Sequence, residues 1–174
     1  MRKGFTLIEL LVVIGIVAIL AAVAILVLNP AELQRQARDS RRISDMATIN
    51  SAINFFNVDV ISQVSSGVSM TAYISIPDPA ATSTAGTDCS GVGPPTSTLP
   101  SGWSYHCAAS STYRSVNGLG WIPVDFSQIS FRPPFGTLPV DPVNTISSGE
   151  YYTYTSGGSW ELTAIMESTK YGPG

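Results

Sequence analysis

Hydrophobic and polar positions divide the chain into three stretches with different patterns. The run from Phe5 to Leu28 is almost entirely apolar, and Glu9 is its one charged residue. As an α-helix, this run would extend roughly 36 Å, which is long enough to cross a bilayer. From Ala31 the pattern is amphipathic, and from Val60 it changes to short runs separated by Ser, Thr, Gly and Pro. We therefore predict an apolar helix, an amphipathic helix and a β-rich domain.

The amphipathic stretch carries an apolar stripe with spacings of three and four residues. Its members are Ile43, Met46, Ala47, Ile49, Ile53 and Phe56. We expect this stripe to pack on a C-terminal sheet. Asp39 with Arg42, and Arg38 with Asp45, are candidate ion pairs within the subunit or between subunits. The alternative is that these charges form a solvated face of the helix.

Asn29 and Pro30 lie between the two helical stretches. Asn29 is a good helix cap, Pro30 suits a first turn, and Glu32 stands where a capping-box carboxylate belongs. Inside one continuous helix, Pro30 would lose a backbone hydrogen bond and kink the axis. The sequence allows either a break at this point or a single kinked helix.

Three short runs in the last stretch are strand candidates, and we expect an antiparallel sheet of three or four strands. The runs are residues 72–76, 103–108 and 121–126, and Pro123 would place the last of them at a sheet edge.

Residues 151–166 form the clearest hairpin, with Gly157-Gly158 suited to a two-residue turn. In this register Trp160 and Leu162 share the core face with Thr153 and Thr155, and the opposite face carries Glu161 and Glu167 outward. The hairpin aromatics are sheet packing or, as a less favoured alternative, a patch that contacts sugar or DNA. They are Tyr151, Tyr152, Tyr154 and Trp160.

Charge is sparse and uneven. Asp, Glu, Lys and Arg make up 12% of the residues, about half the average of ~25% for soluble domains. From Asp59 onward there are eight acidic and three basic residues, so we expect no dedicated nucleic-acid ligand. A weakly charged surface suits a protein packed among its own copies, and an ordinary secreted domain has the same property.

Cys89 and Cys107 are the two cysteines of the chain. We expect a disulfide between them, worth ~3 kcal/mol in the chain-entropy model. The alternative is a pair of buried free thiols. There is no Cys-x-x-Cys motif and no cluster of Cys with His, so we expect no zinc site.

The first nine residues resemble the class III signal of type IV pilins and pseudopilins. Met1-Arg2-Lys3-Gly4 is a short basic leader, and Phe5-Thr6-Leu7-Ile8-Glu9 opens the apolar helix. The resemblance implies cleavage between Gly4 and Phe5 by prepilin peptidase, and N-methylation of Phe5. It also implies an α+β pilin-like fold, in which a long N-terminal helix packs on a small antiparallel β-sheet.

This interpretation divides the chain into four parts. They are the leader (residues 1–4), a transmembrane and filament-core helix (5–30), an amphipathic helix (31–58) and a C-terminal β-rich globular domain (59–174).

Cleavage also offers a reason for Glu9, because an unpaired charge inside a bilayer is costly. The cut creates an α-amine on Phe5, and an amine and a carboxylate neutralise one another at low dielectric. The resemblance implies that Glu9 pairs with the N-terminus of a neighbouring subunit and so sets the register of assembly. A pair within one helix is also within reach. A chain that keeps its leader lacks this amine. The alternative is a Glu9 that reaches the lipid headgroups.

Two other interpretations of the N-terminus compete with this one. A secretory signal could be cut at residues 22–24, but the apolar run exceeds the usual 7–15 residues. A plain anchor gives no reason for Glu9. Basic residues lie on both sides of the run, at Arg2 and Lys3 and again from Arg35 to Arg42, so charge alone does not orient the helix. The expected disulfide and the resemblance place the C-terminus outside.

The resemblance implies a structural subunit of a type IV pilus. The precursor would be a single-pass protein of the inner membrane, and the product an extracellular homo-oligomeric filament built with an assembly platform and an ATPase. The runner-up is a major pseudopilin of a type II secretion system, and a third candidate is a membrane-tethered binding domain. Neither catalysis nor a cofactor is expected, because the one histidine, His106, adjoins Cys107, and no hydrolase or phosphate-loop motif occurs.

One further stretch bears on the family. Leu138-Pro139-Val140-Asp141-Pro142 is similar to the LP-x-DP stretch of G-type pseudopilins, in which a following loop binds calcium. The nearby oxygen-rich candidates here are Asp125, Asp141, Asn144 and Glu150. They lack the close carboxylate spacing that calcium favours. We therefore expect an ordinary turn at Asp141-Pro142 and no metal.

Overall fold

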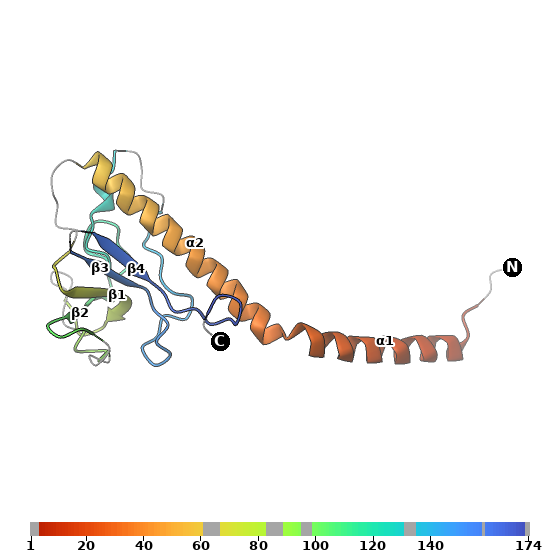
Figure 1. Ribbon diagram of the computed structural model, residues 1–174. Helices are drawn as coiled ribbons and strands as arrows, with labels where there is room; N and C mark the ends of the chain where they lie inside the picture. Colours follow the sequence, from red (N-terminus) through yellow and green to blue (C-terminus); the bar gives the residue numbers. More distant parts are fainter. Residues whose placement is uncertain are drawn as a thin grey trace.

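The computed structural model describes residues 4–60, 67–82, 89–94, 99–130, 135–157 and 159–172. Two helices come first, α1 (Leu7–Leu28) and α2 (Pro30–Asp59). They are followed by β1 (Thr71–Asp78), β2 (Ser104–Ala109), the 3-10 helix η2 (Phe126–Gln128), β3 (Thr153–Ser156) and β4 (Trp160–Thr163). Figure 1 shows α1 projecting as a rod from a globular part, in which α2 lies along the sheet.

The two helices are separate because Asn29 leaves the helical conformation. Its φ of 39° and ψ of 78° are left-handed, and it is at once the C-cap of α1 and the N-cap of α2. Its side-chain oxygen accepts the Glu32 N–H at 3.4 Å. Pro30 occupies the first position of α2, where the N–H that it lacks is not needed. The chain therefore breaks at Asn29 and does not run on as one kinked helix.

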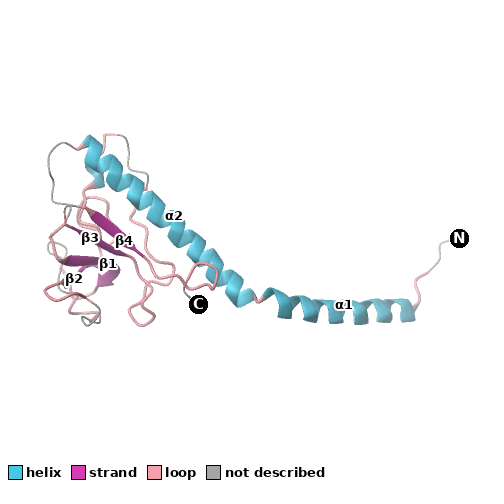
Figure 2. Cartoon of the chain, in the orientation of Figure 1, coloured by secondary structure: helices cyan, strands magenta, loops and turns pink. Residues whose placement is uncertain are grey.

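The sheet has four strands in the order β2-β1-β3-β4 and is mixed (Figure 2). The α+β pilin-like architecture is confirmed, but the sheet is not wholly antiparallel, because β1 and β2 pair in parallel from Thr71↔Ser104 to Ile74↔Cys107. Parallel neighbours need a long crossover, and the segment between Asp78 and Ser104 supplies one.

The β3–β4 hairpin has a register that differs from the predicted one by a single residue. Ser156 lies opposite Trp160, and Tyr154 opposite Leu162, so three residues connect the strands. The predicted turn lies partly outside the described residues, at Gly158. The shift turns Tyr152 and Tyr154 to the side of the sheet that packs on α2, and both are fully buried. The large tyrosine rings fill the space under the helix that the prediction had assigned to threonines.

The main core lies between α2 and this face of the sheet. Ile49, Ala52, Ile53 and Phe56 are the apolar residues of α2 that are buried. They pack with ring residues of the C-terminal part, namely Tyr73, Trp121, Phe126, Tyr152 and Tyr154. Ile43 and Ala47, predicted to lie in the stripe, are exposed. The helical period extends the buried face through Met46 to Arg42 and Asp39 instead.

Residues 121–126 are not a strand. Trp121, Ile122, Val124 and Phe126 are all at most 1% exposed, so the run fills the core without the alternation of a half-buried strand. It leads into η2, and its one strand-like feature is an isolated bridge between Asn117 and Asp125. Pro123 has no N–H to give to a ladder, which explains why the segment packs as irregular chain.

A second, smaller core covers the other face of β1. Ala72, Ile74 and Ile76 point into it, together with Tyr105 and the disulfide-bonded pair Cys89 and Cys107. Because β1 is buried on both faces, it is the central element that joins the helix side of the domain to the disulfide side.

Candidate functional site

The N-terminal end of α1 is a capping box built from Thr6 and Glu9. The Glu9 N–H donates to Thr6 Oγ1 at 3.3 Å, and Glu9 Oε2 accepts from the Thr6 N–H at 2.8 Å and from Thr6 Oγ1 at 2.7 Å. These bonds satisfy donors that the first turn of a helix leaves free. Gly4, just before the cap, is exposed, and a Cβ placed on it would meet nothing within 4 Å. The predicted cleavage point is therefore open to a peptidase.

The same hydrogen bonds bear on the role of Glu9. In the uncleaved chain its carboxylate already has two hydrogen-bond donors, both supplied by Thr6. A new α-amine on Phe5 would therefore add a compensating positive charge and would not supply the first hydrogen bond. Glu9 is exposed, so the structure leaves room for a partner group at this end of the helix.

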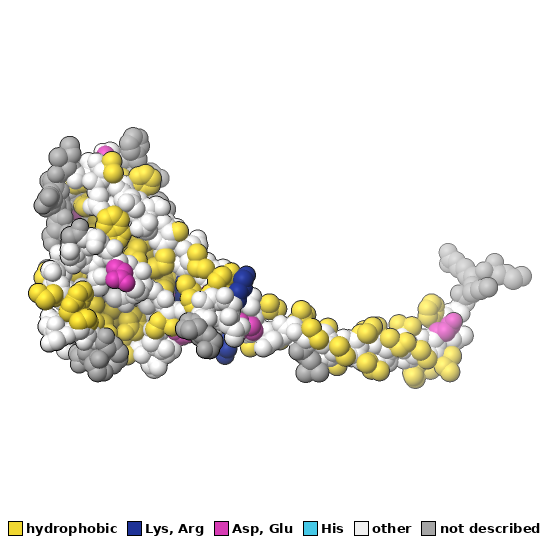
Figure 3. Space-filling view, in the orientation of Figure 1, with side chains coloured by type: hydrophobic (Ala, Val, Ile, Leu, Met, Phe, Trp, Pro, Cys, Tyr) yellow, Lys and Arg dark blue, Asp and Glu magenta, His cyan; other side chains and the backbone are white. Residues whose placement is uncertain are grey.

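Helix α1 presents apolar side chains to every side. All of its residues whose side chains the structure describes are exposed, and Figure 3 shows hydrophobic side chains along the whole rod. Residues Leu7–Ile25 are long and apolar enough to cross a membrane, with a mean hydropathy of 3.0. Such a helix, close to the N-terminus, fits a membrane-anchored precursor.

The base of α2 is held by the last described residues of the chain. Glu32 Oε1 accepts from the Thr169 N–H and from Thr169 Oγ1, both at 2.9 Å. The hydroxyl of Thr169 is the main cause that lowers the pKa of Glu32. Since Glu32 is the third residue of α2, these bonds attach the helix to the C-terminal segment directly after the break.

A buried cluster of charges lies one to three turns further along α2. The guanidinium of Arg42 contacts Asp39 at 2.7 Å, Asp141 at 2.6 Å and Glu167 at 2.6 Å. The side chains of Arg42, Asp39 and Asp141 are fully buried, and that of Glu167 is 10% exposed. Arg38 binds Glu167 through both carboxylate oxygens. The cluster joins the helix, the loop after Pro139 and the C-terminal segment.

Hydrogen bonds lower the pKa of two carboxylates of this cluster, Asp39 and Glu167. Burial disfavours the charge of Asp39, but bonds from Ser168, from the Glu167 N–H and from Arg42 outweigh it and lower its pKa to about 2. Arg38 is the main cause of the lowered pKa of Glu167. Burial also disfavours the charge of Arg42, yet its carboxylate partners raise its pKa further above the usual value. Asp39, Glu167 and Arg42 are therefore ionised at neutral pH.

One of the two predicted ion pairs is confirmed and the other is wrong. The Asp39–Arg42 pair forms, but it is buried within the subunit and is not a solvated face. Arg38 binds Glu167, while Arg41 lies 3.8 Å from Asp45, so the pair Arg38–Asp45 is wrong. Residues seven positions apart on a helix are two turns apart, which is too far for a direct pair.

Glu167, predicted to point outward, is a member of the cluster. Strand β4 ends at Thr163, so strand alternation no longer fixes the direction of Glu167. Its backbone N–H donates to Asp39 at 3.0 Å, and its carboxylate faces Arg38 and Arg42. The available sequence signal was the pair of arginines at positions 38 and 42, which lie one turn apart on a helix and need acidic partners if they are buried.

The four calcium candidates have other roles in the structure. Asp141 binds Arg42 and accepts from the N–H groups of Val143 and Asn144. The side-chain amide of Asn144 donates to the Ser75 carbonyl. Asp125 caps η2, and Glu150 forms an isolated bridge with Thr145. Among the described residues, no group of three or more Asp, Glu, His or Cys side chains could hold a metal ion.

Cys89 and Cys107 are joined in a disulfide, and both are fully buried. The bond ties the segment before β2 to β2 itself. His106, next to Cys107, packs its ring on Tyr73 with 4.8 Å between ring centroids, and burial lowers its pKa. Its neighbouring cysteine has no free thiol, so a Cys–His nucleophile pair cannot form at this place.

Comparison with known proteins identifies the N-terminal segment. Residues 1–25 match the prokaryotic N-terminal methylation motif, which is the class III signal of type IV pilins and pseudopilins. This match confirms the resemblance drawn from the first nine residues. It marks the chain as a substrate of prepilin peptidase and points to a structural protein and not to an enzyme. No curated protein and no solved structure gives a significant match.

Proposed function

We propose that this chain is the major structural subunit of a type IV pilus. It is inserted in the inner membrane with its C-terminus outside, cut between Gly4 and Phe5, methylated on Phe5 and polymerised into an extracellular helical filament. The methylation motif supports a pilin or a pseudopilin. We further propose a pilus, its extracellular filament and a role for Glu9 in assembly, on the basis of the exposed α1 and the charge of Glu9.

The observation that carries the proposal is the exposure of α1. This helix has apolar side chains on all sides, and each Val, Leu or Ile that stays in water forgoes roughly 1.5–3 kcal/mol. In the precursor, lipid covers these side chains. In the product, only a surface of equal apolarity can cover them, and the same helix in neighbouring subunits provides it.

Glu9 sets the register of this packing. In a bundle of apolar helices its carboxylate needs a positive charge, because the Thr6 donors are neutral. The α-amine of processed Phe5 in a neighbouring subunit can provide this charge, because every copy carries it four residues before its own Glu9. Assembly would then depend on cleavage, since an uncleaved chain has no α-amine at Phe5.

The experiment compares sheared surface filaments from cells that carry wild-type protein or Glu9→Ala. We expect long filaments from the wild type and none from Glu9→Ala, with the variant still in the membrane and its mature chain beginning at methylated Phe5. Glu161→Gln, an exposed carboxylate on β4, is the control and should assemble. A Glu9→Ala variant that assembles normally would exclude the register role. Absence of filaments from the wild type as well as from the variant would favour the membrane-tethered domain.

The second candidate is a major pseudopilin, favoured by the stretch from Leu138 to Pro142. Such a protein forms short fibres that remain at the cell envelope. Long extracellular filaments at native expression would rule this candidate out. Fibres that form only on overexpression would establish it against the pilus.

A further inference from the structure

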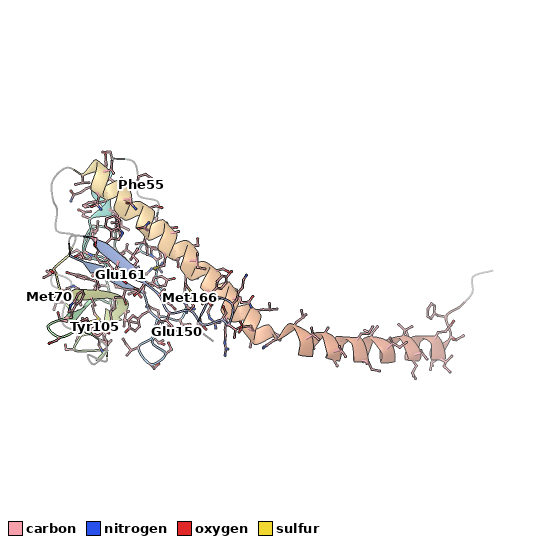
Figure 4. The ribbon with its side chains drawn as sticks, viewed as in Figure 1. Phe55, Met70, Tyr105, Glu150, Glu161 and Met166 are labelled. Carbon is pink, nitrogen blue, oxygen red and sulfur yellow. A yellow bond between two sulfur atoms is a disulfide. The ribbon has the colours of Figure 1, made fainter. Side chains whose placement is uncertain are left out.

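A pocket of about 250 Å³ opens where β3 turns into β4. Met70 and Trp103 line it from the start of β1 and β2, which are neighbours because the Ser104 N–H donates to the Met70 carbonyl at 3.2 Å. Trp160 and Glu161 line it from β4, at the opposite edge of the sheet. Figure 4 labels Met70 and Glu161, which lie on these two sides. The pocket is thus assembled from all four strands.

The lining combines an aromatic ring with hydroxyl groups and one carboxylate. The indole of Trp103 provides flat apolar surface, and Ser69, Thr155 and Ser159 provide hydroxyls that both donate and accept. Glu161 provides an acceptor with two oxygens. None of the described residues that line the pocket is Lys, Arg or His. The lining therefore matches a ligand with an apolar face and several hydroxyl groups, and it repels anions.

Alternation along β4 separates Trp160 from Glu161. The indole N–H of Trp160 donates to Asn50 Oδ1 on α2 at 3.0 Å, so this ring lies on the helix side of the sheet and packs against the main core. Glu161 therefore lies on the other face of the sheet, together with its partner Thr155. At the pocket, Met70 has a φ of 59° and is 54% exposed. Left-handed backbone is uncommon for a residue other than glycine, and it is concentrated at ligand sites.

We propose that this pocket binds a single uncharged sugar unit of a glycan. A pyranose has a C–H face that stacks on an indole and hydroxyls at its rim that bond to Glu161, Thr155 and Ser159. The volume equals that of about eight liquid waters at ≈ 30 Å³ each, which suits one hexose and is smaller than a typical drug-sized site. Sialic and uronic acids, like nucleic-acid phosphates, are excluded by Glu161 and by the lack of a base in the lining.

The test uses the full chain in zwitterionic detergent micelles, because glycoside detergents would compete for the site. Saturation-transfer NMR is recorded with methyl glycosides of glucose, galactose, mannose and N-acetylglucosamine, and with sialyllactose and choline for comparison. We expect transfer to the C–H protons of at least one neutral glycoside and none to sialyllactose or choline. No transfer to any neutral glycoside, or equal transfer to choline or sialyllactose, would overturn the proposal.

Variants locate the binding. Trp103→Leu and Glu161→Gln should each weaken the affinity about tenfold or more. Glu150→Gln, a carboxylate outside the pocket, should leave it unchanged. Glu161 is exposed, so its substitution tests the site even where Trp103→Leu lowers the melting temperature. Unchanged binding in both pocket variants would exclude this site. The readout needs only the folded chain, so it is independent of filament assembly.

Discussion

Arg42 and Asp141 are 99 positions apart in the sequence, yet two parallel hydrogen bonds of 2.6 and 2.9 Å join them in a place closed to solvent. A fork-to-fork pair of this kind fixes both the distance and the orientation of the two groups. Asp39 and Glu167 contact the same guanidinium, and Glu167 is bound by Arg38 as well. Arg42 is thus the cation that joins three carboxylates from three segments of the chain.

Arg42→Met should destabilise the chain strongly. Removal of one member of a buried ion pair typically costs about 3–5 kcal/mol, because the remaining charges stay buried without compensation. The measurement is thermal or denaturant unfolding of the full chain in micelles at pH 7. Arg41→Met is the matched control, since the Arg41 side chain is 62% exposed, and a surface pair contributes about 0–1 kcal/mol. Equal losses in the two variants would contradict the central role of Arg42.

The stability of the wild type should fall in acid between about pH 4 and pH 2. The pKa of Asp39 is lowered from 3.8 to about 2 in the folded chain, so the unfolded state binds more protons in this window. The contribution, about 2 kcal/mol, is complete above the unfolded pKa and is lost as the pH falls through the folded one. Glu167, whose pKa is also lowered, acts in the same direction. Asp39→Asn should flatten the pH dependence of unfolding, and a variant with the wild-type slope would contradict this assignment.

Removal of the disulfide by Cys89→Ala with Cys107→Ala should lower the free energy of unfolding by about 3 kcal/mol. The bond closes a loop with a sequence separation of 18, and its loss frees the unfolded chain. Mass spectrometry after alkylation should find no free thiol in the wild type purified from cells. A labelled thiol in folded wild type would show that the bond does not form in the cell.

Substitution of both break residues, Asn29→Ala with Pro30→Ala, should join α1 and α2 into one helix. Alanine restores the backbone N–H at position 30 and removes the left-handed cap. Spin labels at the exposed residues Val17 and Ser44 should then be about 40 Å apart along a straight axis, and closer in the wild type, where the axis changes direction (Figure 1). Asn54→Ala, on the exposed side of α2, should leave the wild-type distance unchanged.

Local chemistry made much of the fold predictable. The run from Phe5 to Leu28 has no alternative to an apolar helix, and Asn29 with Pro30 carries capping signals that act within one turn. Residues 72–76 lie within β1, and the predicted strand 103–108 differs from β2 by one residue at each end, because strand propensity is also local. The parallel pairing of β1 with β2 depends on the long connection between them. The residues within the two strands do not indicate whether the pairing is parallel or antiparallel. The one-residue shift of β3 against β4 has a different cause, namely the fit of Tyr152 and Tyr154 under α2.

The buried charge cluster shows what the sequence conceals at the candidate site. Arg42 and Asp39 stand at helical spacing and were expected to meet. Asp141 was named among the calcium candidates but expected to form an ordinary turn, and its partnership with the guanidinium of Arg42 was not foreseen. Glu167 was assigned to the outside by strand alternation, and only the spacing of Arg38 and Arg42 indicated that acidic partners were needed. A contact across about one hundred residues depends on the whole fold, so pattern arguments that cover one element cannot find it.

The position of Asn29 gives the molecule a defined path for tension. Because the side chains described in α1 are all exposed, a pull on this helix reaches the globular part through the backbone at Asn29. It then acts on the first turn of α2, where Glu32 is bonded to Thr169, and next on the charge cluster around Arg42. A force that would separate α2 from the sheet therefore acts first on these hydrogen bonds and ion pairs. The apolar core behind them, from Ile49 to Phe56, is thereby shielded from the force.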